Sequence, residues 1–258
     1  MTPLVRSRVG SGAQAAVATL TLDSPHNRNA LSVRLIGELR SALQIALDNP
    51  AVRVIVLTHH GPAFCSGADL AEAADRSTAA ALPASLPALL QALWDSPKPT
   101  VARVAGPARA GGIGLLGACD IVVCSADATY AFPEVRLGLV PAVISATVLP
   151  KLQRSAVHEL FLTGGTFDAQ RAVQIGLATT AVPRAELDAQ AQHYVDMLLR
   201  GGPGALAATK ALLRRQHPRL GDLAELSELS AHHFTGDEGQ EGLAALAANR
   251  DPSWFHRP

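Results

Sequence analysis

The sequence has few cysteines, few aromatic residues and no net charge, and each shortage excludes a class of protein. Three cysteines among 258 residues are too few for a disulfide framework, so we expect reduced thiols and a cytoplasmic location. Aromatic residues make up 4%, which argues against a binding face of stacked rings. The 22 basic residues balance the 22 acidic ones, which argues against a nucleic-acid binder or a polybasic membrane-surface protein.

Long apolar runs are also missing. The longest, such as 54–57 and 121–124, are far shorter than the roughly 20 residues that a membrane-spanning helix needs. Residues 1–12 contain no apolar run of signal-peptide length, so we expect no export. What is present is 48% hydrophobic residues, enough for a sizeable core in one large domain with at most a modest appendage.

Apolar periodicity predicts an α/β chain. Ile36, Leu39, Leu43 and Leu47 repeat at helical spacing after Ser32, a residue type that caps helices. Strand, glycine-rich turn, helix and strand then recur in that order, which favours a parallel sheet with helices outside. Strands are expected at 15–23, 52–58, 100–105, 120–125, 129–132 and 178–182. Helices are expected at 32–48, 68–74, 86–94, 113–118, 148–162, 168–176, 185–199, 204–215, 222–234 and 237–248, and residues 75–87 as a mobile connection.

A change in character near residue 190 predicts two parts. Residues 1–190 are mixed α/β, and residues 191–258 are almost entirely helical. Gly201-Gly202-Pro203 interrupts the helical part. Because so small a helical appendage cannot bury its own apolar face, we expect it to pack on the core or on another subunit, and its size favours oligomerisation.

Two glycine-rich turns, at 61–70 and 106–114, each follow a buried strand and open a helix. A helix start presents unpaired backbone N–H groups, and glycine lets a ligand approach them closely. Two such turns facing each other would bind one oxygen with developing negative charge, as an oxyanion hole does. Either turn alone is also an ordinary strand–helix connection. Neither matches a Walker loop or a dinucleotide-binding fingerprint.

An ordered series of motifs over nearly the whole chain resembles the crotonase (enoyl-CoA hydratase/isomerase) superfamily. The matching segments are Asn27-Arg28-Asn29-Ala30-Leu31, 63–70, 106–120, Phe132-Pro133-Glu134-Val135-Arg136-Leu137-Gly138-Leu139-Val140-Pro141, Leu162-Thr163-Gly164, 172–177 and Glu241-Gly242. The resemblance implies a spiral of repeated ββα units at 1–190 that carries an acyl-CoA site. It further implies a helical trimerisation segment at 191–258, a homotrimer or dimer of trimers, and stabilisation of a thioester enolate.

By position, the resemblance makes the backbone amides of Ala68 and Gly111 the oxyanion donors and Glu134 the acid/base. The apolar neighbours of Glu134 would raise its carboxyl pKa towards a useful range. The alternative is a surface glutamate paired with Arg136. The implied substrate and CoA contacts are Asn27, Arg28, Ala63, Cys65, Gly67, Asp69, Leu70, Gly112, Pro133 and Pro141.

For several of these residues, a structural role is an alternative to a contact with substrate. Arg28 would contact a phosphate or be a solvated turn residue, and Asp69 would cap its own helix or touch substrate. Arg109 stands where the family generally has an apolar residue, and a subunit contact is favoured over an acidic acyl group. Arg250 and Trp254 would reach a neighbouring subunit's nucleotide site.

Gly114 stands where the best-known hydratases have a first glutamate, so Glu134 would act alone. The string 135–145 together with Gly114 resembles a subgroup that hydrates branched or glutaconyl-type CoA esters. A 2-enoyl-CoA hydratase is therefore the leading prediction. The alternatives are a Δ3,Δ2-enoyl-CoA isomerase and a catalytically silent acyl-CoA-binding homologue.

No metal or separate cofactor is predicted, because coenzyme A is part of the substrate. Adjacent residues do not share a face of a helix or strand, so neither His59-His60 nor His232-His233 is a chelating pair. The cysteines, at positions 65, 119 and 124, have apolar neighbours and are expected to be small core residues. The predicted partners are an acyl-CoA thioester and further copies of the chain, without nucleic acid or a membrane span.

Overall fold

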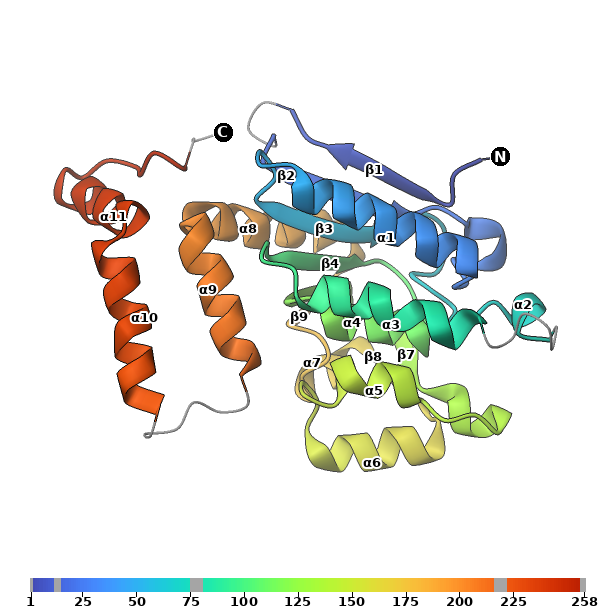
Figure 1. Cartoon of the computed structure of the whole chain (residues 1–258). Coiled ribbons are helices and arrows are strands. Elements are labelled where there is room, and N and C mark those ends of the chain that lie inside the picture. Colours follow the sequence, from blue (N-terminus) through green and yellow to red (C-terminus); the bar gives the residue numbers. More distant parts are fainter. Residues whose placement is uncertain (1, 12–14, 75–80, 216–221, 256–258) are drawn as a thin grey trace.

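A computed structural model describes residues 2–11, 15–74, 81–215 and 222–255, and it has the predicted mixed α/β architecture (Figure 1). The larger sheet has the strand order β1-β2-β3-β4-β6-β9. These strands are β1 (Val5–Val9), β2 (Val17–Leu22), β3 (Val54–His59), β4 (Thr100–Val104), β6 (Ile121–Ser125) and β9 (Thr180–Val182). Neighbours from β2 to β9 are parallel, as predicted, whereas β1 pairs antiparallel with β2 at the edge.

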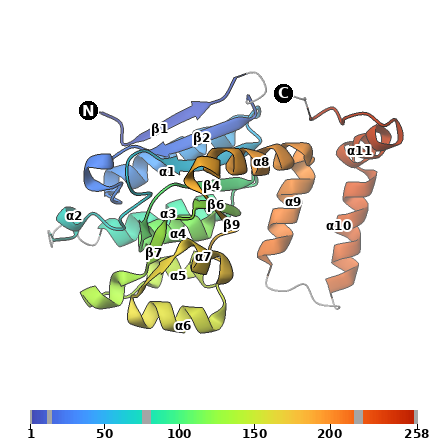
Figure 2. The ribbon, with the colours of Figure 1, turned by 180° about the vertical axis from the view of Figure 1, so that it is seen from behind.

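Each face of the larger sheet is covered by its own apolar layer. Because successive side chains on a strand point to opposite faces, Val54 of β3 joins one layer and Ile55 joins the other. The Ile55 layer includes residues of α1 (Val33–Asp48), α3 (Ala81–Trp94) and α4 (Gly111–Ala118). Helix α8 (Leu187–Arg200) covers the opposite face, as the two views show (Figures 1 and 2).

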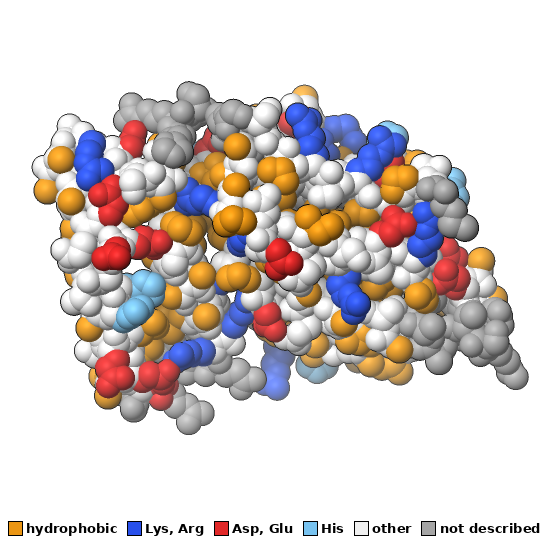
Figure 3. Space-filling view, turned by 45° about the horizontal axis from the view of Figure 1, so that its top comes forward, with side chains coloured by type: hydrophobic (Ala, Val, Ile, Leu, Met, Phe, Trp, Pro, Cys, Tyr) orange, Lys and Arg blue, Asp and Glu red, His pale blue; other side chains and the backbone are white. Residues whose placement is uncertain are grey.

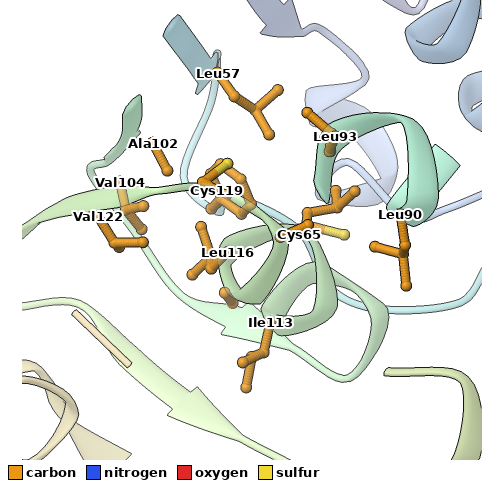
Figure 4. Packing of buried hydrophobic residues seen from close by; sticks show 14 of the residues in the cluster. Leu57, Cys65, Leu90, Leu93, Ala102, Val104, Ile113, Leu116, Cys119 and Val122 are labelled. Carbon is orange, nitrogen blue, oxygen red and sulfur yellow. The ribbon is translucent and has the colours of Figure 1, made fainter. Parts of the chain in front are cut away.

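Helix α4 lies inside the molecule, and all eight of its residues are buried. Leu116 of α4 lies on the side of the sheet residues such as Val122, whereas Ile113 points away from them (Figure 4). Burial on all sides explains a sequence with no polar face, since a helix that meets only apolar neighbours needs none. The sheet and α3 therefore hold the start of α4 in a fixed place.

A smaller sheet joins the second glycine-rich turn to the segment that follows β6. It has the order β5-β7-β8 and consists of β5 (Ala108–Arg109), β7 (Thr129–Ala131) and β8 (Thr166–Asp168). Strands β5 and β7 are parallel, with Arg109 opposite Ala131. Strands β7 and β8 are antiparallel. Three helices flank this sheet: α5 (Ala142–Val148), α6 (Arg154–Thr163) and α7 (Ala169–Gln174).

Several predicted helices and strands are confirmed with small changes at their ends. Helix α1 begins where expected, because Ser32 Oγ accepts a hydrogen bond from Leu35 N at 3.1 Å. Asp168 caps α7 in the same way, through Arg171 N at 2.7 Å. The remaining helices are α2 (Leu70–Ala74), α9 (Pro203–Arg214), α10 (Leu223–Thr235) and α11 (Asp237–Ala247).

Three expectations are wrong. Helix α3 begins at Ala81, within the stretch 75–87 predicted as a mobile connection, of which residues 75–80 lie outside the described part. The helix expected at 148–162 begins only at Arg154, as α6, whereas residues 142–148 form a separate helix, α5, that was not expected. Pro150, which has no N–H to donate to a helix, lies between the two. Strands β1, β5 and β8 were not expected.

The three C-terminal helices α9, α10 and α11 lie together on the side of the molecule away from α2 (Figures 1 and 2). They leave large apolar side chains in contact with solvent. These exposed residues are Leu213, Leu223, Phe234, Leu243 and Leu246. Helix α8 runs across the boundary predicted near residue 190 and packs on the sheet.

The face of the molecule in Figure 3 carries charges of both signs, interspersed and without a broad patch of either one. This distribution matches the equal numbers of basic and acidic residues. In the described part of the chain, every helix is too short or too polar to span a bilayer.

Candidate active site

Backbone hydrogen bonds hold the two glycine-rich turns side by side. Cys65 forms a parallel bridge with Ala108. Phe64 N donates to Pro107 O at 2.9 Å, and Arg109 N donates to Cys65 O at 2.9 Å. A β-carbon on Gly106 would lie 2.4 Å from Pro62 O, so only glycine allows this approach. The structure thus brings together two segments that lie some 40 positions apart in the sequence.

The amides of Ala68 and Gly111 lie at the ends of these turns. Leu31 contacts both: its N–H donates to Gly67 O at 2.7 Å, and its Cδ1 would lie 2.6 Å from a β-carbon on Gly111. Gly111 opens α4, so its N–H has no acceptor within the helix. Among the described residues, neither Ala68 N nor Gly111 N donates to an acceptor. Both amides are therefore available to a ligand.

Glu134 follows strand β7 of the smaller sheet, which is hydrogen-bonded to the second glycine-rich turn. Ala110 N donates to Ala131 O at 3.2 Å, which holds the end of β7 against the start of α4. The chain then enters the 3-10 helix η3 (Pro133–Leu137), with Pro133 at its first position and Glu134 at its second. Leu139 N donates back to Glu134 O at 2.9 Å and closes the turn. The carboxyl thus projects from a short rigid turn, three residues beyond Ala131.

The Glu134 carboxyl is buried and incompletely hydrogen-bonded. The residue is 9% exposed, and its Oε2 has no hydrogen-bond partner within the described part of the chain. Burial raises the pKa of Glu134 above its usual value, against the opposing effect of a hydrogen bond from its own backbone N–H. Arg136 Nε instead donates to Thr163 O at 2.8 Å, so the alternative of a surface Glu134–Arg136 pair is wrong. Such a carboxyl suits proton transfer.

Gly114 stands where a further carboxylate would be expected, and neighbouring side chains already fill the space that such a side chain would need. A β-carbon on Gly114 would lie 2.7 Å from Ile144 Cγ2 and 3.6 Å from Leu90 Cδ1. Ile144 and Leu90 are both buried. The space that a side chain at position 114 would enter is therefore lined by apolar atoms, and a larger side chain there would require α5 to move.

The residues predicted to meet the CoA moiety lie around the first turn. Asn27 Nδ2 donates to Asp69 Oδ2 at 3.1 Å, and Asp69 Oδ1 accepts from Ala71 N at 3.0 Å, as a helix cap does. Arg28 is exposed and ends the 3-10 helix η2 (Pro25–Asn27) in the left-handed conformation. Arg28 O accepts from Ser66 N at 3.1 Å, which ties this segment to the turn.

The other predicted contacts are mostly backbone positions at the turns. A β-carbon on Gly112 would lie 2.7 Å from Cys65 Cβ, so Gly112 is needed for α4 to pack on the first turn. Burial raises the pKa of the Cys65 thiol to about 12, which makes it unreactive at neutral pH. Ala63 is buried beside Cys65, Leu70 opens α2, and Pro141 precedes α5.

Three residues with provisional assignments have partners in their own chain. Arg109 donates to Thr129 O at 2.6 Å and to Thr129 Oγ1 at 3.0 Å. Arg250 pairs with Glu241 at 2.7 Å, and Trp254 Nε1 donates to Arg200 O at 3.0 Å. All of their partners belong to the same chain, and none of these contacts needs a second subunit.

Asn29 was quoted only as part of a motif, yet its side chain holds the first turn in place. Its Oδ1 accepts from Ser24 N at 2.7 Å, and its Nδ2 donates to His60 O at 3.0 Å and Ala63 O at 2.8 Å. It is fully buried, with a φ of 55°. The available signal was the residue type, since asparagine bonds nearby backbone and tolerates positive φ.

Comparisons with known proteins show which family the chain belongs to. The family model described as enoyl-CoA hydratase/isomerase matches residues 12–257, and the chain belongs to this family. The 2,3-dehydroadipyl-CoA hydratase of Escherichia coli is 32% identical over 260 residues and covers all of both chains.

Solved structures give the same result. An enoyl-CoA hydratase from Mycobacterium avium is 42% identical, with a TM-score of 0.74 over 99% of this chain and 100% of that one. An enoyl-CoA hydratase from Shewanella pealeana is 32% identical, with a TM-score of 0.89 over 97% of this chain and 96% of that one. The fold, including the C-terminal helical segment, is thus that of the crotonase superfamily.

Proposed function

We propose that the protein is a 2-enoyl-CoA hydratase in which Glu134 is the single acid/base. The observation that carries the proposal is the state of Glu134, which is buried, has a raised pKa and leaves Oε2 without a partner. Its turn follows β7, which hydrogen-bonds to the residue before Gly111. Family membership and the named activities of the relatives support the same reaction.

In this mechanism the amides of Ala68 and Gly111 bind the thioester oxygen. The Glu134 carboxylate takes a proton from water, and the water oxygen bonds to C3 of the enoyl chain. The electron pair of the C2–C3 double bond moves towards the thioester oxygen, where the two amides stabilise the enolate. Glu134 then returns the proton to C2, and the thioester carbonyl re-forms. One carboxyl can serve both steps because both take place on the same face of the substrate.

A Δ3,Δ2-enoyl-CoA isomerase is the second candidate, and the surroundings of Gly114 favour it. Ile144 and Leu90 fill the space at this position and offer no polar atom to hold a water molecule. Isomerisation needs none, since Glu134 would move a proton between C4 and C2. The same residues would serve either reaction.

The assembly, the CoA contacts and the location belong to the proposal as well. The exposed apolar side chains of α10 and α11 support a homotrimer or dimer of trimers built through the helical segment 191–258. Exposed Arg28, beside the first turn, would contact a CoA phosphate. The three buried free thiols suit a cytoplasmic location.

The test is Glu134→Gln assayed with crotonyl-CoA and with a 3-enoyl-CoA. The substitution keeps the shape of the side chain but removes its proton-transfer capacity, so we expect turnover to fall by about 10²–10⁴-fold. Binding of the CoA ester should change little, because the two amides remain. The direction of change in conjugated-enoyl absorbance separates hydration from isomerisation.

Unchanged turnover in the Gln variant would overturn the mechanism. A wild-type protein that binds acyl-CoA tightly but converts none of a panel of short, long and branched esters would favour the catalytically silent homologue.

A further inference from the structure

Ala110, the residue before Gly111, has a backbone conformation that residues with a β-carbon rarely adopt. Its φ is 47° and its ψ is −118°. Arg28, also with positive φ, lies in the ordinary left-handed region with ψ 39°. The angles of Ala110 are instead close to those of the first central residue of a type II′ turn, a position that glycine dominates. Such strain persists only where the surrounding structure holds it.

Hydrogen bonds on both sides hold Ala110 in this conformation. Its N–H donates to Ala131 O at 3.2 Å, and its C=O accepts from Ile113 N at 2.9 Å and Gly114 N at 3.2 Å. The preceding residue, Arg109, is bound to Cys65 O through its N–H and to Thr129 through its guanidinium. The chain must therefore turn sharply at Ala110 to pass from β5 into α4.

The methyl group of Ala110 faces the other glycine-rich turn. A β-carbon added to Gly67 would lie 3.1 Å from Ala110 Cβ and 3.4 Å from Arg109 O. Gly67 directly precedes Ala68, and Ala110 directly precedes Gly111. The Ala110 methyl therefore spaces apart the two residues that come just before the two amides. The ψ of Ala110 also fixes the plane of the peptide that carries the Gly111 N–H.

We propose that Ala110 is a positioning residue, whose methyl group sets the separation of the two turns and whose strained backbone aims the Gly111 N–H. This inference rests on the proposed function, in which the amides of Ala68 and Gly111 bind the thioester oxygen. Ala110 itself does not react. It acts through the direction and spacing of two backbone donors.

The test is Ala110→Gly, read by the carbonyl stretching frequency of bound butyryl-CoA labelled with ¹³C at the thioester carbon. Glycine adopts positive φ freely, so this variant should fold with an unchanged or raised midpoint of thermal unfolding. Two donors aimed at the oxygen lower the frequency, and looser donors lower it less. We expect Ala110→Gly to lose at least half of the wild-type shift. Its kcat should fall by about 10-fold or more, with KM changed by less than about 3-fold, because small misplacements are costly in the transition state.

Two controls separate spacing from general relief of strain. Ala110→Ser keeps the β-carbon and should keep the wild-type frequency. Asn249→Gly relieves another positive φ, of 49°, beyond the end of α11 and should leave both frequency and kcat unchanged. An Ala110→Gly protein with the wild-type frequency and kcat would overturn the inference, as would an equal loss in Ala110→Ser. A wild-type protein that leaves the carbonyl frequency at its value in water would instead overturn the proposed function.

Discussion

Glu134 combines a chemical advantage with a cost in stability. A buried carboxylate without a full set of hydrogen bonds is less well solvated than the same group in the unfolded chain. Burial therefore raises the pKa of Glu134 in the folded protein above the usual 4.5. The folded state holds this proton more tightly than the unfolded state does. Wild-type stability is thus lost as the pH rises through the folded-state pKa.

Glu134→Gln should for this reason be more stable than wild type at pH 8, by on the order of 1 kcal/mol. The glutamine carries no charge to desolvate, so its advantage is full above the folded-state pKa and fades as the pH falls from that value towards 4.5. Urea unfolding of both proteins at pH 8 and pH 4 measures the difference. An advantage of the same size at both pH values would contradict the explanation by charge burial.

The sequence identified Glu134, Ala68 and Gly111 as candidates because residue type and motif order carry that information. It did not indicate Ala110. An alanine gives no sign of a positive φ, and here the conformation is set by hydrogen bonds to Ala131 and to the first turn of α4. The partners of Arg136 and Arg109 were equally hidden, since Thr163 and Thr129 approach them only through the fold.

At the scale of elements, the contact between α4 and α5 depends on glycines without room for a β-carbon. Besides the contact at Gly114, a β-carbon on Gly117 would lie 2.9 Å from Thr147 O. Thr147 Oγ1 also donates to Gly114 O at 2.9 Å. The two helices thus pack with their backbones unusually close at this point.

Gly114→Ala should lower the free energy of unfolding by about 1–3 kcal/mol, because the new methyl overlaps Ile144. Gly37→Ala is the matched control. Gly37 lies exposed inside α1 with nothing within 4 Å of its added β-carbon, so alanine there should stabilise by about 0.5–1 kcal/mol. Urea unfolding of both variants gives the two values.

Combining Gly114→Ala with Ile144→Ala tests the cause of this penalty. The overlapping atom is then gone, so the double variant should be more stable than the sum of the single changes implies, by about 0.5–3 kcal/mol. Strict additivity would mean that Gly114 is needed for some reason other than Ile144.

Elements with a strong pattern were predictable and those defined by tertiary contact were not. Helix α1 has both an apolar stripe and a capping serine, and its start was found. Strand β1 is an edge strand with Val5 buried and the rest exposed, so it lacks the alternation that marks a strand. Strand β8 is three residues long and exists only through its pairing with β7.

At the scale of the whole molecule, a largely buried ion pair links α9 to the main sheet. Lys210 Nζ lies 2.5 Å from Asp120 Oδ2 at the start of β6 and donates to Lys98 O at 2.8 Å. Asp120 also accepts from Thr100 N at 2.7 Å. The Lys210 side chain is 8% exposed, and burial lowers its pKa. Arg214 of the same helix also lies 3.6 Å from Asp120 Oδ1, so the position of α9 depends on charged groups as well as on apolar packing.

Asp120→Asn should destabilise the protein by about 2–3 kcal/mol. This is less than the cost of breaking a fully buried ion pair, because about a quarter of the Asp120 side chain is exposed to water. The loss follows from leaving the Lys210 ammonium buried without its partner. Lys210→Met should cost less, since Asp120 keeps its hydrogen bonds from Thr100. Hydrogen exchange along α9, together with urea unfolding, measures both effects. Equal protection of α9 in wild type and Asp120→Asn would show that apolar packing holds the helix.

The family was predictable from an ordered series of motifs, and the parallel order of the main sheet from the recurrence of strand, glycine-rich turn and helix. The second sheet was not predictable, because it rests on the pairing of β5 and β8 with β7. The placement of α9 was not predictable either, because it rests on contacts such as that of Lys210 with Asp120, 90 positions apart. The boundary near residue 190 stays a prediction.

The Ala68 and Gly111 amides, neither of which has an acceptor in the described part of the chain, have a consequence for how this site can be altered. Both donors proposed to bind the thioester oxygen are peptide N–H groups, and every amino acid except proline supplies one. A conventional scan that truncates side chains would therefore pass over residues 68 and 111 without removing either donor. Replacing a single peptide bond by an ester, through semisynthesis or hydroxy-acid incorporation, deletes the N–H and leaves the side chains intact. The two proposed donors are thus not deleted by side-chain truncation and can be deleted by backbone chemistry.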